Sequence, residues 1–155
     1  MRFDRERLLE CLRVERWADQ LAAQDHGSAE ALAAAGIAAA TPLTEAEVDE
    51  ALAAHPRIGD RAKGGGAEAR FSRVEQAASQ DPDAGLELRL RDGNEAYERR
   101  FGRVFLIRAA GRSRIEILAE LERRMDNDPE AELAETAEQL RQIAALRLRQ
   151  IWETA

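Results

Sequence analysis

Residues 127–151, NDPEAELAETAEQLRQIAALRLRQI, carry a clear helical pattern. Asn127-Asp128-Pro129 predicts the start of this helix, because proline is favoured in the first turn. Arg147 falls on its apolar stripe, where a lone buried charge would be costly. We therefore expect Arg147 either to pair with a buried glutamate or to grip a substrate carboxylate with its guanidinium. The other residues of this stripe are Leu133, Ala137, Leu140, Ala144 and Ile151.

Start and stop signals predict further helices in the rest of the chain. Asp4 and Ser113 fit N-caps, and Thr44 with Glu47 fits a capping box. Pro56 forces a stop, because the residue before a proline is pushed out of the helical region. The expected helices cover residues 4–24, 28–40, 44–54, 67–80, 84–100, 113–125 and 129–151.

The apolar segment VFLI, residues 104–107, is the one β-like stretch of the chain. A lone segment cannot make a sheet, so we expect a buried extended connector near residues 103–110 that ends at Gly111. Alanine, leucine, glutamate and arginine dominate the composition and favour helix, whereas the β-formers valine, isoleucine, tyrosine and threonine are scarce. The sequence therefore predicts one all-α domain over residues 1–155, a bundle of about seven to eight helices.

The bulk composition excludes several classes of function. A net charge of -7 argues against general nucleic-acid binding, which requires a basic surface. No apolar run approaches the length of a membrane span, and the charged N-terminus does not resemble a signal peptide. Cys11 is the single cysteine, and no paired His/Cys spacing indicates a zinc site. We expect a cytoplasmic protein without a bound metal.

The chemistry-bearing residues gather in residues 54–76, AHPRIGDRAKGGGAEARFSRVEQ. His55 suits proton transfer because its unperturbed pKa lies nearest neutral pH. Ser72, Glu75 and Gln76 share one face at helical spacing. Ser72 and Glu75 also fit a capping box, and all three could be plain solvent surface. Because this segment of an acidic protein is locally basic, we hypothesise that His55 and Glu75 form a proton-transfer pair over a small anionic substrate.

The second histidine, His26, sits where the first expected helix ends. A histidine at a helix C-terminus can bond the last carbonyl groups, which also interact favourably with positive charge. We expect this structural role for His26 rather than a chemical one.

Three motifs in order resemble a known family. They are His55-Pro56-Arg57-Ile58-Gly59, Ser72-Arg73-x-Glu75-Gln76, and Asn94-x-x-Tyr97-Glu98-x-Arg100-Phe101-Gly102-x-x-Phe105. Together they resemble the 2-oxo-4-hydroxy-4-carboxy-5-ureidoimidazoline (OHCU) decarboxylases, which form (S)-allantoin in urate degradation. Two positions depart from the family pattern: Phe71 stands for the usual tryptophan and Ala78 for a frequent glycine.

The resemblance implies an all-α decarboxylase that needs no cofactor and is usually a homodimer. It implies that His55 and Glu75 are the catalytic residues. The residues that it implies for substrate binding are Pro56, Ser72, Gln76, the connector residues Phe105, Ile107 and Ala109 through their backbone, and Arg147. The substrate would be a small anionic purine derivative, with no nucleic-acid or membrane partner.

The chemistry of this reaction agrees with the residues. Loss of carbon dioxide leaves an electron pair on carbon, and the conjugated ring of the substrate can accept it without a cofactor. His55 and Glu75 would then manage the proton and set the handedness of the product.

Two alternatives remain open at this point. A non-catalytic helical interaction module would expose an apolar groove instead of a polar pocket. A hydrolase of a related ureide would often use a metal, for which the chain shows no evident ligand set, and a chelator would separate that case from a decarboxylase.

Overall fold

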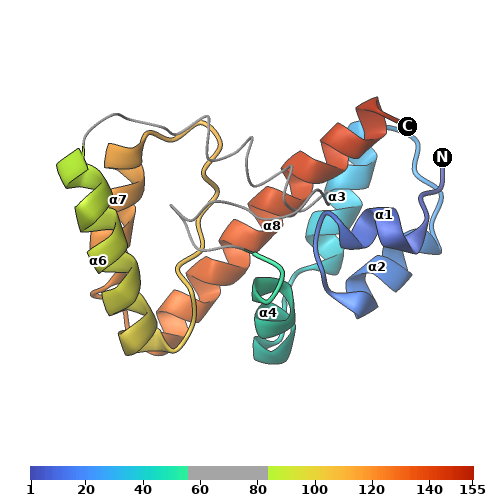
Figure 1. The fold of residues 1–155 in the computed structure, drawn as a ribbon. Helices are drawn as coiled ribbons and strands as arrows, with labels where there is room; N and C mark the ends of the chain where they lie inside the picture. The colour runs from blue at the N-terminus through green and yellow to red at the C-terminus, as the bar shows by residue number, and fades with distance from the viewer. Residues whose placement is uncertain (56–83) are drawn as a thin grey trace. The chain divides into compact units, whose positions relative to one another are not determined.

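The computed structural model describes residues 1–55 and 84–155 (Figure 1). Within these ranges the chain forms seven helices and no β-strand, which confirms the all-α prediction. The helix expected over residues 67–80 lies outside the described residues. The helices are α1 (Arg5–Leu9), α2 (Glu15–Ala22), α3 (Ala29–Ala39), α4 (Glu45–Leu52), α6 (Ala84–Phe101), α7 (Arg114–Arg124) and α8 (Pro129–Glu153).

The chain divides into two compact units. Unit 1 contains residues 1–54 and 137–155, and unit 2 contains residues 55–136. Helix α8, with its 25 residues, contributes its first turns to unit 2 and the rest to unit 1. The description of residues 1–155 as a single domain stays a prediction.

Several helices begin where their capping residues predict. The side chains of Asp4, Ser28 and Ser113 each accept a hydrogen bond from a backbone N–H of the first turn. Thr44 and Glu47 form the predicted capping box, with 3.0 and 3.1 Å between donor and acceptor. Such a cap satisfies N–H groups that have no partner within the helix. Pro129 begins α8 as predicted.

The prediction of one helix over residues 4–24 is wrong, because the chain turns between α1 and α2. Residues 12–14 have no helical structure, and Leu12 and Val14 are buried on either side of the exposed Arg13, an alternation of period two that is typical of extended backbone. Val14 has an extended backbone, and the Glu50 carboxylate accepts a hydrogen bond of 2.8 Å from the Glu15 N–H at the start of α2. Contacts from outside the segment therefore override its helical propensity.

Unit 1 is organised around Trp17, which is fully buried. Its indole N–H donates to the carbonyl of Gly36 on α3 at 2.8 Å. Gly36 lets α3 pack closely against the side chains of Trp17 and Leu148, because a Cβ at this position would lie 3.3 Å from Trp17 and 2.4 Å from Leu148. His26 contacts the Leu21 carbonyl at the end of α2 at 3.2 Å, which confirms its predicted structural position.

In the described part of unit 2, α6 packs on α7 and the connector lies beside them (Figure 1). Residues 104–109 have no regular secondary structure, as predicted. The turns before and after them use Gly102 (φ 71°) and Gly111 (φ 79°), which adopt a conformation that other residues rarely tolerate. The buried core contains Leu86, Leu90, Tyr97, Phe105, Ile107, Ala109, Ile117, Leu118 and Leu121.

No helix in residues 1–55 and 84–155 combines the length and the apolar character that a membrane crossing requires.

Replacing Gly36 with alanine tests the close packing of unit 1. Helix propensity alone would stabilise the protein by about 1 kcal/mol. The contacts with Leu148 and Trp17 predict instead a loss of about 1–3 kcal/mol, because the buried neighbours must move. Gly27→Ala is the control, since a Cβ at Gly27 meets no atom within 4 Å. Urea unfolding of both variants measures the difference, and a stabilised Gly36→Ala protein would contradict this packing.

The Glu47 carboxylate predicts a pH-dependent contribution to the stability of unit 1. A hydrogen bond from Arg16 at 2.6 Å lowers the pKa of Glu47 below its ordinary value of 4.5. A lowered pKa favours the folded state above the ordinary pKa, and this contribution disappears as the pH falls through the folded-state pKa. We expect Glu47→Gln to cost about 1–2 kcal/mol at pH 7 and progressively less below pH 4.5.

Urea unfolding between pH 3 and pH 7 measures this difference. Glu45→Gln, at an exposed position in the same turn of α4, controls for the loss of a negative charge at a helix start. An equal effect of Glu47→Gln at every pH would show that the ion pair with Arg16 does not stabilise unit 1.

Candidate active site

His55 lies three residues beyond the end of α4 and is half-buried. The helix closes with a hydrogen bond of 3.2 Å from the Ala54 N–H to the Ala51 carbonyl, and His55 then has no regular secondary structure. The imidazole is thus neither sealed in the core nor fully exposed. A proton-transfer group requires this partial access, because it must reach a bound molecule.

Of the predicted cluster around His55, the structure describes only His55 itself. Pro56, Ser72, Glu75 and Gln76 lie outside the described residues. The His55–Glu75 pair therefore stays a prediction. In residues 1–55 and 84–155, no three His, Cys, Asp or Glu side chains form a group suited to hold a metal ion.

The connector is held in place by its side chains. Phe105, Ile107 and Ala109 are at most 3% exposed and belong to one hydrophobic cluster. The ring of Phe105 meets the ring of Tyr97 edge-on, with 5.2 Å between centroids. Beyond the cluster, the Arg112 N–H donates to the Ala109 carbonyl at 3.1 Å. The backbone of residues 105–109 is therefore fixed on a packed core, which is what a pocket wall made of backbone groups requires.

Arg147 is fully buried on α8, within unit 1. Its apolar neighbours Leu140, Ala144 and Ile151 on the predicted stripe are buried too. Leu133 is only half-buried. A buried guanidinium needs a partner of opposite charge or several acceptors. Its role toward a substrate stays a prediction.

A second buried arginine, Arg124, was not predicted as a functional residue. It is 1% exposed and donates from Nε to the Glu132 carboxylate, which is 2% exposed. Its Nη1 donates to the Leu106 carbonyl at 2.8 Å, and its Nη2 donates to the Thr136 hydroxyl at 3.2 Å. Its Cζ lies 4.6 Å from the centroid of the Phe105 ring, within cation–π range. One guanidinium thus joins the connector to the end of α7 and the start of α8.

Burial dominates the electrostatics around Arg124. It raises the pKa of the Glu132 carboxyl, and the hydrogen bond from Arg124 offsets part of this rise. Burial also raises the pKa of Tyr97, and the negative charge of Glu132 raises it further. The cluster is therefore a set of coupled polar groups in a water-poor part of unit 2.

The sequence contains a signal for Arg124 but not for Glu132. Arg124 continues the buried face of α7 at the spacing of Ile117 and Leu121, the same pattern that marked Arg147. Glu132 lies in the first turn of α8, where acidic residues are common on the solvent side because they favour the helix dipole.

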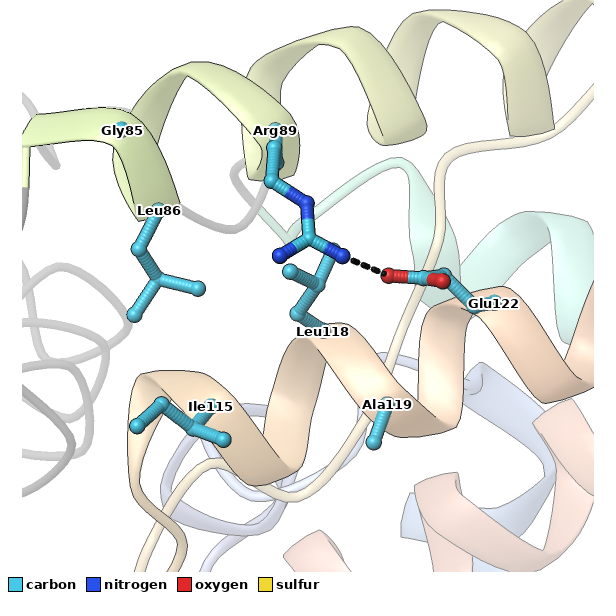
Figure 2. A pocket seen from close by; sticks show the side chains of 7 residues that line it. All are labelled: Gly85, Leu86, Arg89, Ile115, Leu118, Ala119 and Glu122. Atoms are coloured by element: carbon cyan, nitrogen blue, oxygen red, sulfur yellow. Dashed lines mark hydrogen bonds and ion pairs between the residues drawn. The ribbon is translucent and has the colours of Figure 1, made fainter.

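A groove of about 540 Å³ lies between α6 and α7, and Figure 2 shows the side chains that line it. Arg89 of α6 and Glu122 of α7 form an ion pair of 2.9 Å, and both are largely exposed. The groove contains none of the predicted site residues. Its lining consists of Gly85, Leu86, Arg89, Ile115, Leu118, Ala119 and Glu122.

Comparison with known proteins decides the family. The sequence profile of the OHCU decarboxylases matches residues 4–149, which is nearly the whole chain. The chain belongs to the OHCU decarboxylase family. This membership confirms the prediction of a carboxy-lyase that acts in urate degradation. No curated protein sequence matches the chain.

Two solved structures share the fold of this family member. One is a crystal structure of OHCU decarboxylase in the presence of (S)-allantoin, at 24% identity and a TM-score of 0.82, with 97% of this chain and 99% of the other covered. The other is a crystal structure of (S)-allantoin synthase, at 22% identity and a TM-score of 0.67. That match covers 93% of this chain and 48% of the other. At these identities the likeness concerns the fold alone.

Proposed function

We propose that this carboxy-lyase converts OHCU to (S)-allantoin without a cofactor, and that His55, paired with Glu75, moves the proton that sets the handedness. The observation that supports this most is the family match over residues 4–149, which includes both positions. The half-buried position of His55 after α4 suits this role, because the imidazole can reach a bound ring.

The reaction breaks the bond between the ring carbon and its carboxylate. Carbon dioxide leaves, and the bonding electron pair passes into the conjugated C=N and carbonyl groups of the ring. The hydroxyl group on that carbon loses its proton and becomes a ring carbonyl of the product. A proton adds from one face to the neighbouring ring carbon, which carries the ureido group, and this makes the product single-handed. The protein must orient the ring, stabilise the developing charge and place the proton donor on that face.

Other predicted residues would hold the substrate. Ser72 and Gln76 would hydrogen-bond the ring, and Pro56 with the backbone of residues 105–109 would line the pocket. Arg147 would bind the carboxylate of the substrate through its guanidinium fork. A cytoplasmic homodimer is part of the same proposal.

Replacing His55 with asparagine should abolish the stereospecific reaction. Without a positioned proton donor, the catalysed rate should fall by about 10²–10⁴-fold, and the product should be the racemic mixture of the spontaneous decay. Circular dichroism of allantoin formed from freshly generated OHCU measures both rate and handedness. His26→Asn is the control, because His26 is buried against the Leu21 carbonyl and has no proposed part in the chemistry.

A full rate in His55→Asn, with single-handed product, would overturn the assignment of His55. A chelator in the same assay should leave the rate of the natural sequence unchanged. Loss of activity with chelator would favour the metal-dependent hydrolase instead.

Replacing Arg147 with lysine tests its proposed contact with the substrate. Lysine keeps the charge but cannot offer two parallel N–H groups to a carboxylate. We expect kcat/KM to fall by about 10–100-fold, the effect of losing a hydrogen bond to a charged group. Arg149→Lys is the matched control, because Arg149 lies two residues further along α8 and pairs with Glu30 at the surface at 2.9 Å. Equal kcat/KM values for both variants would exclude Arg147 from the site.

A further inference from the structure

The donors of the Arg124 guanidinium are distributed over separate parts of unit 2. Nε donates to the Glu132 carboxylate and Nη2 donates to the Thr136 hydroxyl. Glu132 and Thr136 lie in the first turns of α8. Nη1 donates to the Leu106 carbonyl, in the middle of the connector, at 2.8 Å. The ring of Phe105, the preceding residue, lies 4.6 Å from the guanidinium carbon. Arg124 therefore holds the connector both by a backbone hydrogen bond and by a ring contact.

A gain in stability does not by itself account for the buried ion pair of Arg124 and Glu132. Burying an ion pair removes two charges from water, and well-packed apolar residues often serve as well or better. Arg124 and Glu132 are almost completely buried, so the full cost of desolvation applies. What apolar side chains could not supply is a set of directed donors at fixed angles, which the planar guanidinium provides.

The connector is the part of unit 2 that needs such a directed contact. Residues 104–109 belong to no helix or strand, so regular backbone pairing does not fix their path. Leu106 lies between Phe105 and Ile107, whose backbone is expected to line the pocket. A hydrogen bond to the Leu106 carbonyl sets the orientation of the peptide plane between Leu106 and Ile107. Small displacements of a binding wall lower reaction rates strongly, because the reacting groups lose alignment.

We propose that Arg124, with Glu132 as its counter-ion, is a positioning residue for the decarboxylation: it fixes the connector backbone, and through it the substrate. This rests on the proposed function, in which residues 105–109 line the pocket. In this proposal Arg124 contacts neither the substrate nor the transferred proton, and its effect on the reaction passes through the Leu106 carbonyl and the Phe105 ring.

The test compares Arg124→Lys with Arg123→Lys. A lysine at position 124 can still pair with Glu132, but its single ammonium group cannot serve Glu132, Leu106 and Thr136 with the same geometry. Arg123 is the matched control, because it also links α7 to a glutamate of α8, Glu135, at 2.6 Å, but its side chain is 51% exposed.

Two measurements are made on each variant. Amide hydrogen exchange, read by NMR, reports the opening of residues 104–109 independently of activity. Steady-state kinetics on freshly generated OHCU report kcat and KM. For Arg124→Lys we expect exchange in the connector to rise by roughly tenfold relative to α1, α2 and α3, and kcat/KM to fall by about 10–100-fold. Arg123→Lys should change neither.

Unchanged exchange in the connector of Arg124→Lys would overturn the proposal. The proposed function would not be affected by that result, because the His55 variant tests it separately. Faster exchange with unchanged kcat/KM would overturn it as well, and would argue that the connector is not part of the pocket. If Arg124→Lys does not fold, the pair Arg124→Met/Glu132→Leu replaces it, since an apolar pair can restore stability. A folded double variant with full kcat/KM would equally overturn the proposal.

Discussion

The fold requires hydrogen-bond donors for backbone carbonyl groups that accept no hydrogen bond within a helix. A buried carbonyl without a partner costs about 1–3 kcal/mol, a large fraction of the stability of a small protein. Arginine side chains supply several of these donors, at the end of α3, in the connector and after α7. Arg124 bonds the buried Leu106 carbonyl at 2.8 Å, and Arg16 and Arg141 bond the part-buried carbonyls of Ala39 and Ala40, each at 2.9 Å. The bond of Arg100 to the Asn127 carbonyl, at 2.7 Å, is exposed.

This use of arginine is consistent with an imbalance in the composition, in which Lys63 is the only lysine among the 23 lysine and arginine residues. A guanidinium offers five donors in a plane, so it can bond a carbonyl and a carboxylate at once. Arg16 does so with Ala39 and Glu47, and Arg124 with Leu106 and Glu132. The ammonium group of a lysine, on its flexible side chain, is less suited than a guanidinium to bond a carbonyl and a carboxylate at the same time.

Sequence patterns predicted the fold class, most helix starts and the family, because caps and motifs are local signals. Ser113 and Pro129 mark the starts of their helices without reference to the rest of the chain. The turn between α1 and α2 could not be predicted, since Glu50 caps α2 from another helix. Of the candidate site, the buried connector was foreseen. The pairing of Arg124 with Glu132 was not, because it joins residues on two helices.

The division of α8 between the two units has a consequence for synthesis on the ribosome. Unit 1 needs residues 137–155, which follow all of unit 2 in the chain. Phe3, just before α1, packs against Trp152 of α8, with 5.8 Å between ring centroids, so the start of the chain must meet the end of the last helix. At ordinary elongation rates, the N-terminal helices wait on the order of ten seconds for this partner. During that interval their apolar faces are open to chaperones and to neighbouring chains, so the order of synthesis adds a risk of aggregation that the stability of the finished fold does not remove.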